Sequence, residues 1–85
     1  MNNSLENISI IDRQSFIQFI TQLREDYLTN KDAWENHTLD SFLEAMARYA
    51  SAIQGYYNNT GQNTNADTPS WAVFADILKG ATIYE

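Results

Sequence analysis

Cysteine is absent from this sequence, which excludes disulfide bonds, a thiolate nucleophile and a zinc site with cysteine ligands. Glycine occurs only at positions 55, 61 and 80, too far apart for a phosphate-binding loop. The acidic pairs Glu25–Asp26 and Asp40–Glu44 lack the Glu-x-x-His motif that accompanies carboxylates in di-metal helical sites. We therefore interpret these carboxylates as solvated helix faces and predict no bound metal.

Basic side chains are few: 5 Lys and Arg residues stand against 11 Asp and Glu residues, which gives a formal charge of −6 at pH 7. This balance disfavours nucleic acid and anionic membranes as partners, because both are bound mainly through Lys and Arg. No apolar run approaches the ~18 residues of a membrane span, and the polar start from Met1 to Ser9 is unlike a signal peptide. We expect a soluble cytoplasmic protein, whose acidic surface either serves solubility or suits a basic partner protein.

The single histidine, His37, precedes the start of a predicted helix, with Asp40 three residues further on. A carboxylate can orient a histidine as a general base, but catalysis also needs a nucleophile or a substrate pocket, and the sequence indicates neither. We interpret His37 as a surface or capping residue, and we predict no enzymatic activity and no cofactor.

Two stretches place apolar side chains on one face at helical spacing, and each follows a capping residue. A helix over residues 13–28 follows Asp12, and a helix over 39–54 follows Thr38 and is expected to end at Gly55. The first stripe comprises Phe16, Phe19, Ile20, Leu23 and Tyr27, and the second Leu39, Phe42, Leu43, Met46, Tyr49, Ala50 and Ile53.

A third helix is predicted over residues 69–80, with Thr68 as its cap, Pro69 at its first position and Gly80 ending or loosening it. Its main stripe comprises Trp71, Phe74, Ala75 and Leu78, with Val73 and Ile77 well off it. A helix that is apolar over most of its circumference is usually buried, so we expect it to lie centrally against the other two.

Together these patterns predict one domain over residues 1–85, an all-α, compact three-helix fold with room for a short fourth turn near Trp34. Residues 1–8 are expected to be frayed. Short extended segments at the two ends are a further expectation, with Ile83 and Tyr84 packing beside Ile8 and Ile10. The core should be thin, because a chain of this size buries only about 60–65% of its unfolded surface.

The segment between the second and third helices combines aromatic rings with amides, a composition typical of recognition surfaces. Its candidate binding residues are Tyr56, Tyr57, Asn58, Asn59 and Trp71, to which Trp34 is added from the earlier connection. The alternative is that the rings only cover the open end of a small core while the amides fix a turn. We favour this structural role for the segment and also for Trp34, whose ring we expect to fold over the gap between the first two helices.

Several short strings resemble a family of small, stand-alone bacterial proteins known only as a domain of unknown function. They are Trp34-Glu35-Asn36, Thr38-Leu39-Asp40, Phe42-Leu43-Glu44-Ala45, Gly55-Tyr56-Tyr57, Asn59-Thr60-Gly61, and Pro69-Ser70-Trp71 with the tail Ile83-Tyr84-Glu85. The resemblance spans most of residues 10–85 and implies an intracellular bacterial protein. It implies no activity, cofactor or catalytic residue.

Three hypotheses of function follow. The first is a non-enzymatic module that binds a basic protein, of the kind found among immunity proteins and antitoxins. The second is a structural protein that forms a homodimer through Val73 and Ile77 of the third helix and Tyr84 of the tail. The third, given least weight, is a small-molecule site formed by Tyr56, Tyr57 and Trp71.

Overall fold

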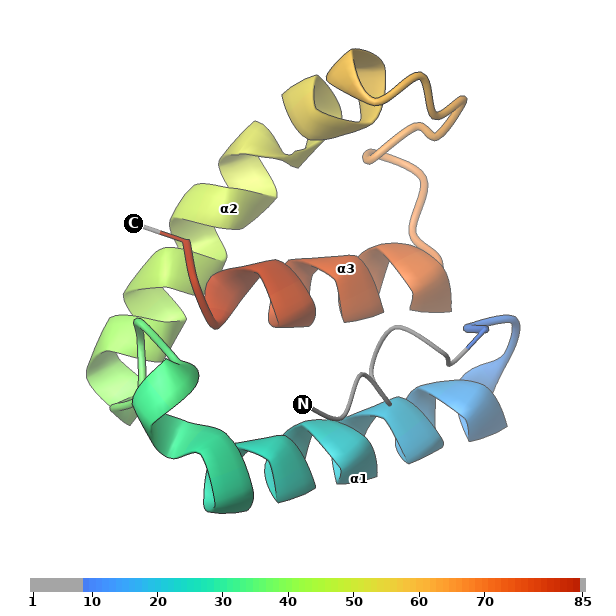
Figure 1. Ribbon diagram of the computed structural model, residues 1–85. Coiled ribbons are helices and arrows are strands. Elements are labelled where there is room, and N and C mark those ends of the chain that lie inside the picture. Colours follow the sequence, from blue (N-terminus) through green and yellow to red (C-terminus); the bar gives the residue numbers. More distant parts are fainter. Residues whose placement is uncertain (1–8, 85) are drawn as a thin grey trace.

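The computed structural model describes residues 9–84, which contain three α-helices, one short 3-10 helix and no strand. The elements are α1 (Arg13–Asn30), η2 (Lys31–Ala33), α2 (Leu39–Asn59) and α3 (Trp71–Ala81). Figure 1 shows α1 and α3 side by side and running in the same direction, while α2 crosses α3 obliquely. The predicted all-α, three-helix fold is confirmed, and η2 is the short extra turn near Trp34. The frayed start predicted for residues 1–8 lies outside the described range.

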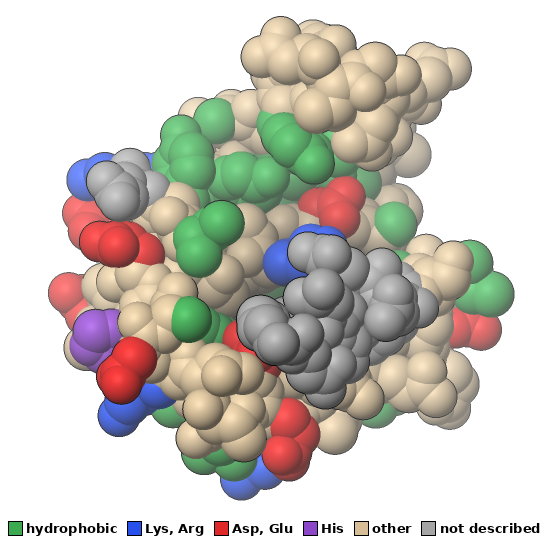
Figure 2. Space-filling view, in the orientation of Figure 1, with side chains coloured by type: hydrophobic (Ala, Val, Ile, Leu, Met, Phe, Trp, Pro, Cys, Tyr) green, Lys and Arg blue, Asp and Glu red, His purple; other side chains and the backbone are tan. Residues whose placement is uncertain are grey.

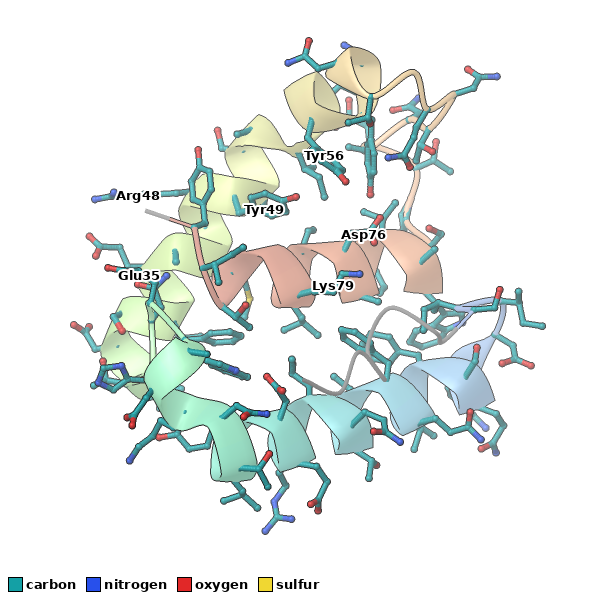
Figure 3. All side chains as sticks on the ribbon, viewed as in Figure 1. Glu35, Arg48, Tyr49, Tyr56, Asp76 and Lys79 are labelled. Atoms are coloured by element: carbon teal, nitrogen blue, oxygen red, sulfur yellow. The ribbon has the colours of Figure 1, made fainter. Side chains whose placement is uncertain are left out.

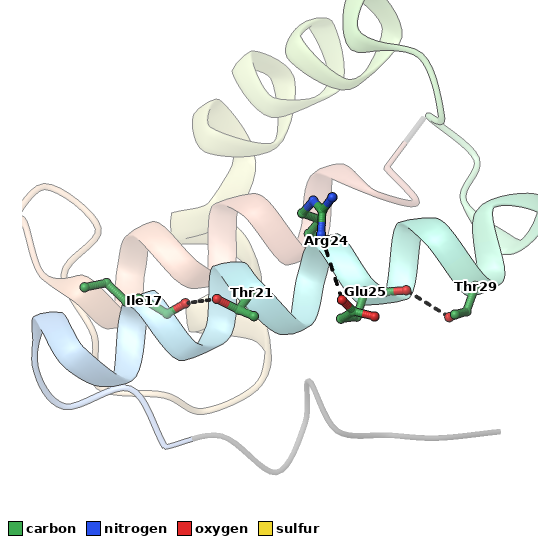
Figure 4. Close-up of polar contacts among 5 residues, drawn as sticks. All are labelled: Ile17, Thr21, Arg24, Glu25 and Thr29. Carbon is green, nitrogen blue, oxygen red and sulfur yellow. Dashed lines mark hydrogen bonds and ion pairs between the residues drawn. The ribbon is translucent and has the colours of Figure 1, made fainter.

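Helix α1 begins at a reciprocal capping box, in which the Asp12 carboxylate accepts the Ser15 amide at 2.8 Å and the Ser15 hydroxyl oxygen accepts the Asp12 amide. These two hydrogen bonds engage backbone amides that have no acceptor within the helix. The bonds that the carboxylate accepts from Ser15 also lower the pKa of Asp12. At the other end the helix continues two residues beyond the predicted end. The Thr29 hydroxyl donates to the Glu25 carbonyl within this last turn (Figure 4).

Helix α2 begins at Thr38, as predicted, but the predicted end at Gly55 is wrong. The helix continues to Asn59, and Gly55 has ordinary helical surroundings with open space where a side chain would lie. The glycine that adopts a positive φ, 73°, is Gly61, just beyond the last turn. The left-handed conformation that commonly follows a helix end therefore falls six residues later than expected.

The connection from α2 to α3 is fixed by a side chain of α2. Gln54 accepts the Ala66 amide at 2.7 Å through its carbonyl oxygen and donates to the Thr64 carbonyl at 2.9 Å through its amide nitrogen. The carbonyl oxygen and the nitrogen of the Gln54 side-chain amide thus both bond to loop backbone, which ties the connection to the last two turns of α2.

Helix α3 starts later than predicted, at Trp71, because Ser70 rather than Thr68 is the cap: its hydroxyl accepts the Val73 amide at 3.1 Å. Pro69 consequently precedes the helix. The predicted central position of α3 is confirmed, since it packs against both α1 and α2. One side of α3 contributes Ala75 to a cluster with Phe19 and Leu23 of α1, and the other side contributes Val73 to a cluster with two residues of α2.

Burial of Val73 corrects one expectation. Its side chain is enclosed by Ile53 and Tyr57 of the same chain, with Ile77 packed against this cluster. Val73 is therefore part of the core and is not available as the homodimer contact that its off-stripe position suggested.

The carboxyl-terminal segment folds as turns against the end of α3. The amides of Ile83 and Tyr84 both donate to the Gly80 carbonyl. Ile10, in contrast, packs on the cluster between α1 and α3. The expected extended pairing of Ile10 with the tail is wrong, and its other member, Ile8, lies outside the described residues.

Two glycines predict opposite responses to the same substitution. A Cβ at Gly80 would overlap the Tyr49 ring, whereas a Cβ at Gly55 would meet nothing within 4 Å. Gly80→Ala is expected to lower the free energy of unfolding by about 1–3 kcal/mol, because the ring must leave its packed position. Gly55→Ala is expected to raise it by about 0.5–1 kcal/mol, because alanine restricts the unfolded chain and favours helix.

Urea denaturation followed by circular dichroism measures both changes. If Gly80→Ala and Gly55→Ala changed the free energy of unfolding by the same amount, the close approach of α2 and α3 at Gly80 would be contradicted.

Candidate functional site

The aromatic and amide residues at the end of α2 are divided between core and surface. Tyr57 is only 1% exposed and belongs to the core, whereas Tyr56 is 46% exposed. Asn58 and Asn59 are exposed, and the Asn58 side chain accepts the Gln54 amide at 3.1 Å. For Tyr57 the structural role of covering the core is confirmed, and its ring is not available to a partner.

Trp71 lies on a different side of α3 from these tyrosines. Its ring centroid is 5.2 Å from that of Phe16 of α1 and 5.9 Å from that of Phe74. Tyr57 instead packs with Val73, on the side of α3 that faces α2. The candidate residues of the 55–71 segment therefore do not form one continuous surface, although their binding role stays a prediction.

The Tyr57 hydroxyl donates to the Asp76 carboxylate at 2.7 Å, which joins α2 to α3 inside the molecule. Burial of the ring, together with this bond to an anion, raises the pKa of Tyr57 well above its ordinary value. The bond satisfies a hydroxyl that the core would otherwise leave without a partner.

Around this bond the tyrosines form a partly exposed cluster. Tyr49 contacts Tyr84 with ring centroids 5.1 Å apart and Tyr56 at 6.5 Å. In Figure 3, Tyr49 and Tyr56 point from α2 toward the part of α3 that carries Asp76 and Lys79. Burial, and then the charges of these neighbours, raise the pKa of Tyr49. Because Gly80 gives the Tyr49 ring its place against α3, this cluster is a structural feature of the helix crossing.

A second aromatic group forms an open groove at the opposite end of α2. The Trp34 ring stacks on Phe42 of α2, with centroids 5.8 Å apart, and meets Tyr27 of α1 edge-on at 5.2 Å. Trp34 also packs on the cluster between α1 and α3. The expectation that Trp34 folds over the gap between the first two helices is confirmed. Together with Leu39, these rings line a groove of about 230 Å³, which we term the Trp34 groove.

Hydrogen bonds fix the walls of the Trp34 groove. The Trp34 indole N–H donates to the Asp26 carboxylate at 2.7 Å, and the Tyr27 hydroxyl donates to the His37 carbonyl at 3.0 Å. Asn36 anchors the same connection to the carboxyl-terminal segment, since its side chain donates to the Ala81 carbonyl at 3.0 Å. The groove is therefore preorganised by bonds from both sides of the connection.

Exposed leucines extend the apolar surface of the Trp34 groove along α2. Leu39 is 74% exposed and Leu43, one turn further, is 52% exposed. Both belong to the apolar stripe predicted for this helix, but the stripe is wider than the surface that α3 covers. Leucines exposed this far and next to aromatic rings form an apolar patch without a partner in the described part of the chain.

Negative charge is concentrated at this end of the molecule. Residues 25–44 contain six acidic side chains and one basic side chain, a formal charge of −5, which becomes −3 when the adjacent Arg24 and Arg48 are included. The acidic residues are Glu25, Asp26, Asp32, Glu35, Asp40 and Glu44. Ion pairs with arginine engage Glu25 and Glu44, whereas Asp32, Glu35 and Asp40 have no ion pair among residues 9–84. Figure 2 shows acidic side chains along the edge that carries the histidine.

His37 lies on the rim of the Trp34 groove and is exposed. Its Nδ1 atom is 3.2 Å from the Trp34 carbonyl oxygen, and no hydrogen bond in the described range joins its ring to Asp40. Residues 9–84 also contain no group of three or more His, Asp and Glu side chains placed to coordinate a metal, and no helix there is both long and apolar enough to cross a bilayer.

Sequence reasoning identified Trp34 but not the other residues of the Trp34 groove. Tyr27, Leu39 and Phe42 were assigned to helix stripes, because periodicity cannot show which part of a stripe another helix covers. The sequence does contain one signal for this end of the molecule, because six of the eleven acidic residues lie at positions 25–44. The total charge of the chain does not show it.

Comparison with known proteins gives one match. Residues 12–85 match the sequence profile described as "Family of unknown function (DUF7660)", and the chain belongs to that family. No curated protein and no solved structure matches the chain.

The Tyr57–Asp76 bond predicts a coupled effect on stability. Asp76→Ala leaves a buried hydroxyl without an acceptor and should lower the free energy of unfolding by about 1–3 kcal/mol. Adding Tyr57→Phe to that variant removes the unpaired group and should recover part of the loss. Tyr56→Phe, which changes a ring on the surface, serves as the control and should shift the value by less than about 0.5 kcal/mol. Purely additive effects in urea denaturation would contradict the bond.

Alkaline pH provides a second test of this cluster. Tyr49 and Tyr57 have raised pKa values in the folded protein, so the neutral form of each is favoured by folding. Their contribution to stability is complete below the unfolded tyrosine pKa of about 10 and declines as the pH rises above it. The free energy of unfolding should therefore fall above this pH, and less steeply in Tyr57→Phe. An identical slope in the variant and the parent protein would count against the assignment.

Proposed function

We propose that this member of a family of unknown function is a non-enzymatic, acidic protein-interaction module that binds a basic partner protein in the bacterial cytoplasm. The observation that carries the proposal is the concentration of negative charge at residues 25–44, next to an exposed apolar patch. Immunity proteins and antitoxins that neutralise a basic partner would need such a surface.

Unpaired carboxylates make this end suitable for association. Asp32, Glu35 and Asp40 have no ion pair within residues 9–84, so their charge is not offset locally. A surface of one sign steers a partner of the opposite sign into encounter and rejects partners of like sign. Six of the eleven acidic side chains lie between positions 25 and 44, so this part of the chain carries more than half of the carboxylates that could meet a basic partner.

The environment of His37 supports the non-enzymatic part of the proposal. Its Nδ1 atom contacts the Trp34 carbonyl, and no carboxylate bonds to the ring in the described range, so the pairing with Asp40 that the sequence offered is not formed there. No serine or threonine hydroxyl bonds to this ring among the described residues.

Self-association is a second candidate, now through other residues than Val73. Ile11 is exposed at the start of the described chain, and Trp71 and Phe74 remain partly exposed on α3. These three residues line an apolar groove between the segment that precedes α1 and the start of α3. Light scattering over a range of protein concentrations tests this candidate, which requires a species heavier than the 9.7 kDa chain.

Affinity capture from the bacterial host tests the main proposal with two variants of equal net charge. The test variant carries Asp32→Asn, Glu35→Gln and Asp40→Asn. The control variant carries Asn59→Lys, Asn63→Lys and Asp67→Asn, which change the charge by the same amount at the far end of α2, about 30 Å away. A basic protein should be retained by the parent and the control, be lost with the test variant, and elute with added salt.

Mass spectrometry identifies the retained proteins. Retention of the same protein by all three forms, or no protein enriched above background, would contradict the proposed function.

A further inference from the structure

We infer, on the basis of the proposed function, that the Trp34 groove receives one large apolar side chain of the partner, while Lys or Arg residues of the same segment meet the acidic residues of the chain segment 25–44. The occupant is thus a basic segment with an apolar anchor residue. The proposal joins three features: the size of the groove, its fixed walls and the charges around it.

Size favours a side chain over a cofactor. The groove has a volume of about 230 Å³, below the roughly 300–1,000 Å³ of pockets that bury small-molecule ligands. Its walls are the rings of Tyr27, Trp34 and Phe42, with the exposed Leu39 at the edge. A leucine, isoleucine or phenylalanine can fill such a space and remove Leu39 from water at the same time.

Fixed walls favour binding without rearrangement. Asp26 accepts the Trp34 indole N–H at 2.7 Å and also accepts the Asn30 side-chain amide at 3.1 Å, so the carboxylate that orients the indole is itself oriented. The Tyr27 hydroxyl is engaged by the His37 carbonyl. Because these side chains are already ordered, an incoming residue loses less free energy to conformational ordering than it would at a flexible surface.

Charge selects the flanking residues of the occupant. Glu35 follows Trp34 in the sequence and Asp40 follows Leu39, and neither carboxylate has an ion pair in the described range. Two lining residues of the groove are therefore each next to an acidic residue along the chain. Carboxylates in this part of the chain attract the ammonium and guanidinium groups of a basic segment. An apolar residue flanked by Lys or Arg matches this arrangement, and one flanked by acidic residues is rejected.

The same charge argues against a second copy of this chain as the occupant. Each copy carries a formal charge of −6, and its five basic side chains include Arg24 and Arg48, which already pair with acidic residues. Two copies meeting at this groove would bring like charges together, whereas a basic partner would neutralise them.

Fluorescence anisotropy with labelled synthetic peptides tests the inference on the full chain. The probe peptide has a central leucine flanked on each side by lysines. One comparison peptide replaces the leucine by serine, and another replaces the lysines by glutamates. The probe should bind at least about tenfold more tightly than the serine peptide, because burial of one leucine side chain is worth that factor or more. The glutamate peptide should not bind.

Leu39→Ser is the matched protein variant, because an exposed leucine can be removed with little effect on folding. It should weaken probe binding about tenfold and change binding of the serine peptide much less. Ile17→Ser is the control: Ile17 is also an exposed aliphatic residue, but it lies on α1 outside the groove, and its removal should leave probe binding unchanged. Circular dichroism shows that both variants keep their helix content.

The outcomes separate the groove from the proposed function. Equal binding of the leucine and serine peptides, or equal effects of Leu39→Ser and Ile17→Ser, overturns the groove as the anchor site. If the captured host protein still depends on Asp32, Glu35 and Asp40 in that case, the proposed function stands without the groove. A homodimer that Leu39→Ser dissociates would assign the groove to a second copy and also overturn the inference.

Discussion

The crossing of α2 over α3 is the constraint on which the rest of the structure depends. Helix α3 is short and apolar on most sides, so it is stable only when both α1 and α2 cover it. Close approach at the crossing requires the absence of a side chain at Gly80, where the Tyr49 ring lies against the helix backbone. The Tyr57–Asp76 bond then fixes the same two helices further along. These contacts set the direction of α2. Because α2 runs from the acidic residues 25–44 to the loop at 60–70, its direction also keeps these two parts of the molecule apart.

Local sequence signals predicted the helices well where a side chain acts on nearby backbone. Asp12 and Thr38 are caps whose partners are three residues away, and both predicted starts are confirmed. The errors arose where two local signals competed. Gly55 predicts a helix end, but α2 continues past it, since Gln54 bonds to the loop backbone near its last turns, and Gly61 adopts the positive φ. Thr68 and Ser70 were both suitable caps, and only the tertiary position of α3 decides between them.

The candidate site was less predictable, because it depends on which part of each apolar stripe remains uncovered. Composition drew attention to Tyr56, Tyr57 and Trp71, which the structure distributes between the core and two sides of α3. Leu39 had the pattern of a core residue and is instead among the most exposed apolar side chains. The Trp34 groove, formed by residues from α1, the connection and α2, becomes visible only when these elements are assembled. Six of the eleven acidic residues lie at positions 25–44, in the part of the chain that forms the groove, which the total charge alone does not show.

The most direct measurement of the central claim is an NMR titration of the isotopically labelled protein with the lysine-flanked leucine peptide. The chain has two tryptophans, whose indole N–H signals report on two different places. Trp34 lies in the groove with its indole bonded to Asp26, and Trp71 packs with Phe16 on another side of the molecule. Binding at the acidic end predicts that the Trp34 indole and the amides of residues 34–43 shift while the Trp71 indole does not. Shifts confined to Trp71 and the amides of residues 56–71 would contradict the account.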